Sequence, residues 1–148
     1  MTKFLAELAR FARLAEGLDP DQVQSSVKEA IGDRQIAAFF ITTAQFEGYE
    51  KEGIFHAVAI TEDNRLYDLV FGHNYFRFDY VALASVWRVF SRSSTVLREA
   101  SSVPMLLLFL DHRESQTVLA VEGDEARLKE LKHFSDFISK RLQKLGVM

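Results

Sequence analysis

The spacing of the apolar residues changes near residue 34, and this change constrains the fold more than any other feature of the chain. Before it, apolar residues recur at steps of three and four, on one stripe of a helix: Phe4, Leu8, Phe11, Ala15 and Leu18. After it, they follow the period of two that is typical of strands. The pattern predicts an N-terminal helical part followed by a β-rich part.

Two helices are predicted in the N-terminal part. The first ends at Gly17, and Asp19 and Pro20 suit the N-cap and first turn of the second. The second helix carries apolar residues at helical spacing until Gly32: Val23, Val27, Ala30 and Ile31. We therefore expect a helical hairpin over residues 1–32, as an extension of a domain that spans residues 33–148.

Seven strand-like segments and one helix are predicted in the rest of the chain. The segments are residues 34–46, 54–61, 65–71, 75–80, 86–92, 103–110 and 116–122. In the fourth, Phe76, Phe78 and Tyr80 alternate with polar positions, which predicts a half-buried strand. A final helix from near Asp124 has an apolar seam formed by Leu128, Leu131, Phe134, Ile138, Leu142 and Leu145.

This order of elements resembles the pleckstrin-homology-like fold of the bacterial or GRAM type over residues 34–145. Residues 61–67 (TEDNRLY) are similar to the second hairpin of that family, and residues 78–86 (FDYVALASV) to a corner motif. The resemblance implies an α+β domain: a seven-stranded antiparallel partial barrel capped by the C-terminal helix. It also implies a scaffold for protein–protein contacts, because the fold is widely reused in that way.

The first loop of this predicted barrel argues against phosphoinositide binding. Family members that bind inositol phosphates grip them with lysine and arginine near the first two strands. Here the loop from Glu47 to Glu52 has three carboxylates around the single lysine Lys51. Such a loop repels phosphate.

Composition excludes several classes of function. The net charge of −3 leaves no global positive field for nucleic acid. The absence of cysteine excludes thiolate metal sites and suits a reducing compartment. No run reaches the roughly 20 apolar residues of a membrane-spanning helix. We therefore expect a cytoplasmic protein that binds no nucleic acid.

No catalytic or cofactor-binding motif is present in the sequence. There is no P-loop, dinucleotide fingerprint or nucleophile elbow. The four histidines are too far apart in sequence to be neighbouring ligands on one helix or strand: His56, His73, His112 and His133. We therefore expect a protein that is not an enzyme and that needs no metal or cofactor.

One alternative assigns chemistry to carboxylates on adjacent strands. Asp68 and Asp79 could meet across the third and fourth strands, with His56 as a further acid–base group. The chain would then be a small pocket protein of the helix-grip or cone-like type, binding or acting on an apolar molecule. Two solvent-facing strand positions are the favoured explanation of these carboxylates, because nothing nearby in the sequence supplies a nucleophile or an oxyanion donor.

An arginine-rich segment is a candidate binding site. Residues 80–98 contain three arginines and no aspartate or glutamate. Arg88, Arg92 and Arg98 are accompanied there by Trp87 and several hydroxyl side chains. Arginine and tryptophan are enriched at binding hot spots, and hydroxyls beside arginine can hold an anion. An ordinary strand with its arginines in water is the alternative.

The N-terminal helices are a candidate interaction surface. Their apolar stripe includes Phe4, Leu8 and Phe11, and further apolar residues extend around the first helix. We expect this surface to bind a protein partner or a second copy of the chain. The alternative is that both helices pack wholly onto their own domain.

Overall fold

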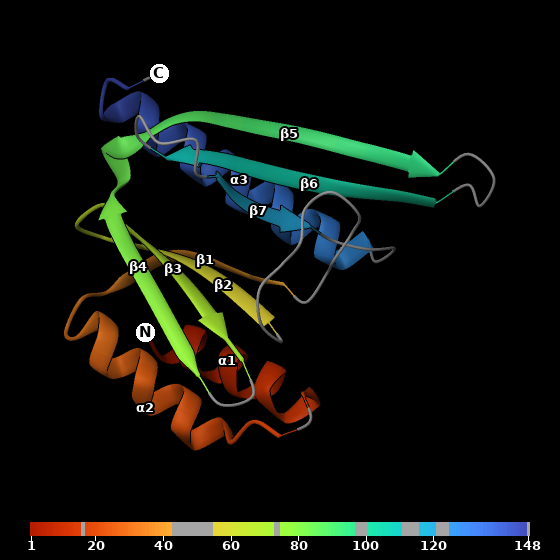
Figure 1. Cartoon of the computed structure of the whole chain (residues 1–148). Helices are drawn as coiled ribbons and strands as arrows, with labels where there is room; N and C mark the ends of the chain where they lie inside the picture. Colours follow the sequence, from red (N-terminus) through yellow and green to blue (C-terminus); the bar gives the residue numbers. More distant parts are fainter. Residues whose placement is uncertain are drawn as a thin grey trace. The chain divides into compact units, whose positions relative to one another are not determined.

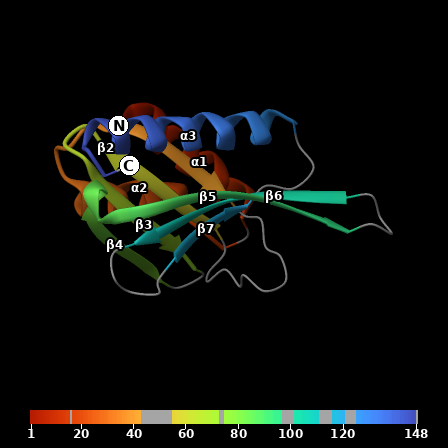
Figure 2. The ribbon, with the colours of Figure 1, turned by 90° about the horizontal axis from the view of Figure 1, so that it is seen from above.

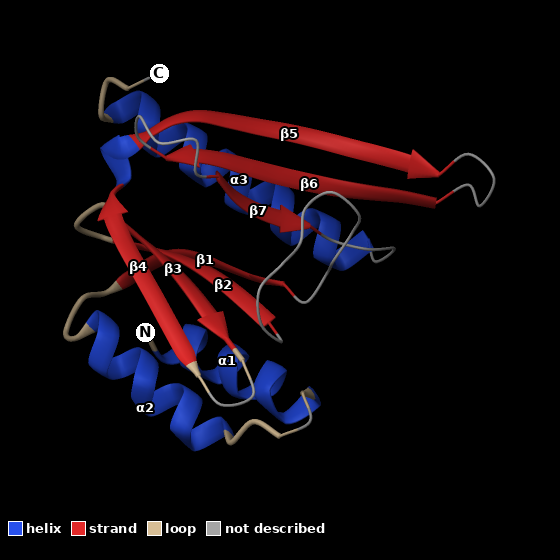
Figure 3. Ribbon diagram, viewed as in Figure 1, coloured by secondary structure: helices blue, strands red, loops and turns tan. Residues whose placement is uncertain are grey.

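The computed structural model divides the chain into two compact units. It describes residues 1–15, 17–42, 55–72, 75–96, 101–110, 116–120 and 125–147. From residue 87 to residue 125 this description covers the backbone and not the side chains. The first unit comprises Met1–Ile41 and Glu52–Val81, and the second comprises Thr42–Lys51 and Ala82–Met148. Each unit has its own sheet and helical cover (Figures 1 and 3).

The first unit begins with the two predicted helices, α1 (Thr2–Leu14) and α2 (Pro20–Ile31). The carboxylate of Asp19 caps α2 by accepting a hydrogen bond from the Asp21 amide at 3.0 Å. A glycine with positive φ, Gly32, follows α2 and lets the chain turn into the first strand. The side chain of Gln24 donates a hydrogen bond to the carbonyl of Leu5 at 3.0 Å, which ties the helices together.

An antiparallel sheet of four strands completes the first unit. In the order of the sheet, the strands are β1 (Ile36–Thr42), β2 (Phe55–Thr61), β3 (Arg65–Phe71) and β4 (Phe76–Ala82). Strands β2 and β3 pair from Phe55 opposite Phe71 to Ile60 opposite Leu66. The outer strands of this sheet are therefore β1 and β4.

Both helices cover one face of this sheet (Figure 1). The shared core joins α1 and α2 to alternate residues of β2 and β3, which have one side chain in two on that face: Phe55, Ala57, Ala59, Tyr67, Leu69 and Phe71. Phe4 on α1 lies 4.9 Å from the ring of Phe39. Leu8 is fully buried in the same cluster. The helices thus supply half of the core of the first unit.

The second unit contains a three-stranded antiparallel sheet and the C-terminal helix. Strands β5 (Val86–Val96), β6 (Ser101–Leu110) and β7 (Gln116–Ala120) lie side by side in that order (Figure 2). Helix α3 (Glu125–Lys144) contacts β5 and β6. Four of the six predicted seam residues are buried: Leu131, Phe134, Ile138 and Leu142. The end positions Leu128 and Leu145 are exposed.

The predicted seven-stranded partial barrel is wrong, although the C-terminal helix is confirmed. The chain has an open four-stranded sheet in one unit, and β5–β7 form a separate sheet in the other. In the first of the two units, residues 1–32 share a core with β2 and β3. Strand periodicity predicts where strands occur, but the pairing between strands is decided by contacts distant in sequence.

Candidate functional site

The outer strand β4 carries the most exposed aromatic surface of the first unit. Tyr75, immediately before the strand, is 45% exposed, and within it Phe78 is 39% and Tyr80 52% exposed. The neighbouring strand β3 is almost entirely buried. The alternation of apolar and polar residues predicted a half-buried strand, but β4 is considerably more exposed than that. The reason is its place at the margin of the helix-covered face.

The aromatic side chains of β4 form a row on the helix-covered face of the sheet. The Phe76 ring lies 5.0 Å from that of Phe71 and 5.8 Å from that of Phe78. Further along, the Tyr80 ring lies 5.4 Å from that of Tyr67. The row begins in the packed core at Phe76 and ends in solvent at Tyr80. We call Phe76, Phe78 and Tyr80 the aromatic row.

A cation lies at the exposed end of the aromatic row. The guanidinium carbon of Arg65 lies 4.8 Å from the centre of the Tyr80 ring. A hydrogen bond with the Tyr67 side chain raises the pKa of Arg65 further above its ordinary value, with smaller contributions from the nearby tyrosines and Asp63. Arg65 therefore stays charged and can hold the Tyr80 ring in place by a cation–π contact.

The register of the β3–β4 hairpin decides which edge of β4 bonds to β3. The Gly72 amide donates to the Tyr75 carbonyl at 2.9 Å, and the ring pairs Phe71–Phe76 and Tyr67–Tyr80 agree with that register. Bonded and non-bonded pairs alternate in an antiparallel ladder. The backbone groups of Tyr75, Arg77, Asp79 and Val81 therefore face β3. Those of the aromatic row face outward.

The opposite face of this sheet contains the carboxylates considered for acid–base chemistry. The register places Asp68 directly opposite Asp79. His56, which is only 6% exposed, contacts the Asp68 carboxylate through Nε2. The structure thus brings His56 and Asp68 into contact and places Asp79 across from Asp68 on the outer strand. No group of three or more potential metal ligands occurs among the described residues, and Asp79 is exposed to solvent.

The predicted arginine site falls mostly outside what the structure describes. Trp87, Arg88 and Arg92 lie on β5, with Arg88 opposite Phe109 and Arg92 opposite Met105 in the ladder with β6. A register irregularity occurs between Val86 and Arg88, at the position of the tryptophan. The side chains of all three, and the whole of Arg98, lie outside the described residues. Their role in binding stays a prediction.

The predicted interaction surface on α1 is occupied by the protein's own core. Phe4 is 1% exposed, Leu8 is fully buried and Phe11 is 9% exposed. All three belong to the cluster that packs α1 against β2 and β3. They are therefore not presented to a partner in this structure. Leu14, at the C-terminal end of α1, is a large apolar residue that is exposed.

The remaining predicted positions do not gather into a site in the described structure. His133 is exposed on α3. His73, His112 and the acidic loop Glu47 to Glu52 lie outside the described residues, so the expected lack of phosphoinositide binding stays a prediction.

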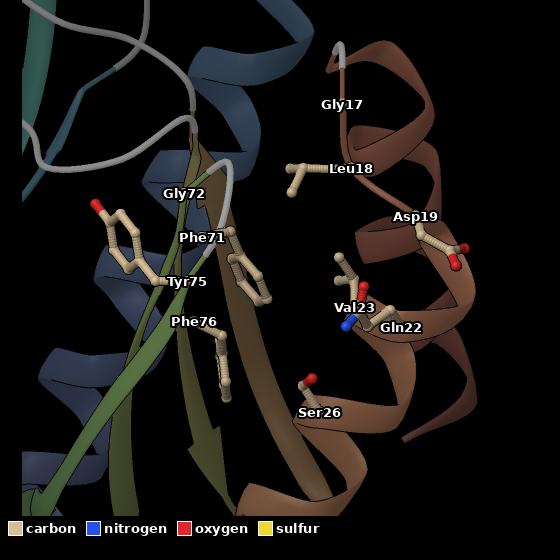
Figure 4. Close-up of a pocket in the computed structure, with 10 residues that line it drawn as sticks. All are labelled: Gly17, Leu18, Asp19, Gln22, Val23, Ser26, Phe71, Gly72, Tyr75 and Phe76. Atoms are coloured by element: carbon tan, nitrogen blue, oxygen red, sulfur yellow. The ribbon is translucent and has the colours of Figure 1, made fainter.

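A pocket of about 290 Å³ lies between the start of α2 and the β3–β4 hairpin (Figure 4). Leu18, Val23 and Phe71 point into it, whereas the Tyr75 ring lies on the other side of the strands (Figure 4). Its polar lining is Asp19, Gln22 and Ser26, none of which is buried. Small-molecule pockets usually hold a few enclosed polar groups that fix the ligand. This pocket does not provide them.

Comparisons with known proteins leave the family of the chain open. No family model, curated protein or solved structure matches it. The resemblance to pleckstrin-homology-like domains therefore stays a prediction. No helix in the described part of the chain has the length and apolar composition of a membrane span.

Proposed function

We propose that this protein is a non-catalytic binding or assembly module whose partner is a protein strand that pairs with the outer edge of β4. The observation that carries the proposal is the aromatic row, which places Phe78 and Tyr80 in solvent beside outward-facing backbone groups. Backbone groups give a strand-pairing interface its affinity, and the alternating side chains give it specificity.

The composition of β4 supports this proposal. Outer strands are commonly protected from pairing by charged side chains, especially lysine, by proline, by β-bulges or by a covering segment. The two charged residues of β4, Arg77 and Asp79, have opposite signs. The seven residues of β4 include no lysine, proline or glycine, and three of the seven are aromatic. The other outer strand, β1, has no large hydrophobic side chain among the exposed ones. Of the two described edges, β4 is the one suited to pairing.

The packing of the first unit favours a binding module over a pocket protein. The shared core fills the middle of the space between the helices and the sheet, where Leu8, Val27 and Phe55 are fully buried, and the pocket at the start of α2 has no buried polar group among its described residues. A helix-grip or cone-like protein needs a cavity in that place. The His56–Asp68 contact lies on the other face of the sheet. The absence of cysteine suits a reducing compartment, and we propose that the module acts in the cytoplasm.

Site-specific photo-crosslinking in the native host tests this function. We would place p-benzoylphenylalanine at Phe78, which keeps an aromatic ring there, and at Leu14 as an exposed apolar control in the same unit. We expect a protein adduct from position 78 that is absent from position 14. The same low yield from both positions would show that β4 is not an interface.

A second pair of variants separates the contribution of the backbone to partner binding from that of the side chain. Phe78→Pro removes both the aromatic ring and an outward-facing amide, whereas Phe78→Ala removes only the ring. We expect both variants to bind the crosslinked partner more weakly than the unmodified chain does, and the proline variant to bind it most weakly. An equal loss in the two would contradict strand pairing.

A further inference from the structure

We infer that the strand that pairs with β4 is the β4 of a second copy of this chain, in an antiparallel arrangement centred on Phe78. This inference rests on the proposed function and names its partner. It follows from the sequence of the exposed strand, Phe76-Arg77-Phe78-Asp79-Tyr80, which is complementary to itself when it is reversed.

The twofold axis at Phe78 makes every facing pair favourable. Phe78 lies opposite the same residue of the second copy, and Phe76 lies opposite Tyr80. Arg77 lies opposite Asp79, and this ion pair occurs twice because the interface is isologous. Aromatic pairs and opposite charges directly across two strands both stabilise a sheet.

The residues of β4 whose backbone groups face outward are the ones that this pairing requires. The outward-facing groups belong to the aromatic row, so Phe78 would form a hydrogen-bonded pair with its symmetry mate. Arg77 and Asp79 then fall at the closer, non-hydrogen-bonded positions, where facing side chains approach best. Arg77 already has an interaction within its own chain, and the five donors of a guanidinium allow a second.

Neighbouring registers are disfavoured by charge. Moving the axis by one residue in one direction places Arg77 opposite Arg77, and in the other direction it places Asp79 opposite Asp79. Like charges directly opposite each other destabilise a strand pair. The two charged residues thus select the register centred on Phe78.

The aromatic row would lose its exposure in this arrangement. Phe78 and Tyr80 are 39% and 52% exposed in the single chain, and both would face aromatic rings of the second copy. The contact is small beside the roughly 20–30 residues that each partner contributes to a stable interface, so we expect a weak, concentration-dependent dimer.

Charge reversal in the full chain tests the inference. Sedimentation equilibrium from about 10 µM to about 1 mM, a range suited to a small interface, should detect the dimer. Arg77→Asp and Asp79→Arg each turn two attractive pairs into two repulsive ones, and we expect each to weaken dimerisation about tenfold or more. The double variant restores opposite charges across the axis. We expect it to dimerise within about threefold of the unmodified chain.

The possible results separate this inference from the proposed function. Self-pairing is wrong if the chain is monomeric throughout that range, if the single reversals have no effect, or if the double reversal fails to restore the dimer. Circular dichroism checks that each variant is folded. If the single variants unfold, p-benzoylphenylalanine at Phe78 still tests the register, because an adduct between the two copies at β4 is expected. An adduct with a different protein would overturn self-pairing and leave the binding function standing.

Discussion

Replacing Leu8 by alanine tests whether α1 is part of the core of the first unit. Leu8 is fully buried in the cluster that joins α1 to β2 and β3. A leucine-to-alanine change in a packed core loses the transfer free energy of the removed atoms and leaves a cavity, at a total cost of about 2–5 kcal/mol. We expect the free energy of unfolding of the first unit to fall by that amount.

Leu14 provides the matched control on the same helix. Its side chain is 76% exposed, so Leu14→Ala removes the same atoms without opening a cavity. We expect a change within about 0.5 kcal/mol. The difference between the two variants then measures burial, because the chemistry of the substitution and its helix are the same.

Native-state hydrogen exchange is the suitable assay because the two units can open separately. A single melting curve would mix their transitions. The amides of β2 and β3 report the opening free energy of the first unit directly, and those of β6 serve as an internal reference in the second. We expect Leu8→Ala to lower protection in β2 and β3.

A small effect would refute the core assignment. If Leu8→Ala lowers the opening free energy of β2 by less than about 1 kcal/mol, well below the usual cost of a buried leucine, α1 does not pack in this core. The helices would then be an extension of the sheet, as the periodicity alone indicated.

Two further predictions concern the hairpin strands. Asp68→Ala should destabilise the β2–β3 pair by about 1–3 kcal/mol because buried His56 loses its partner, whereas Asp68→Asn, which keeps an acceptor, should cost less. Equal losses of hydrogen-exchange protection in β2 and β3 would contradict a specific contact. At Gly72, an added Cβ would lie 2.1 Å from the Tyr75 ring, so we expect Gly72→Ala to cost about 1 kcal/mol in the unmodified chain and less in a Tyr75→Ala background. A double-mutant cycle with no coupling between the two positions would show that the ring does not pack there.

The sequence by itself determined the local elements. Apolar spacing of three and four predicted α1, α2 and α3, and the residues Asp19 and Gly32 marked the ends of α2, because helix periodicity and capping depend on neighbours within a few positions. Alternation likewise identified the residues of β4 that share a face. These features are local, so a single sequence contains them.

The tertiary structure alone decided which faces are covered. The stripe with Phe4 and the row with Phe78 are both apolar patterns, yet the first is buried against β2 and β3 and the second reaches solvent at an outer strand. The contact of His56 with Asp68 also depends on the register between two strands. Strand pairing and the packing of helices on a sheet are contacts between residues distant in the chain. The local periodicity of a segment does not specify which distant segment it will contact. For the same reason, β1–β4 and β5–β7 form two sheets where the strand order alone predicted one barrel.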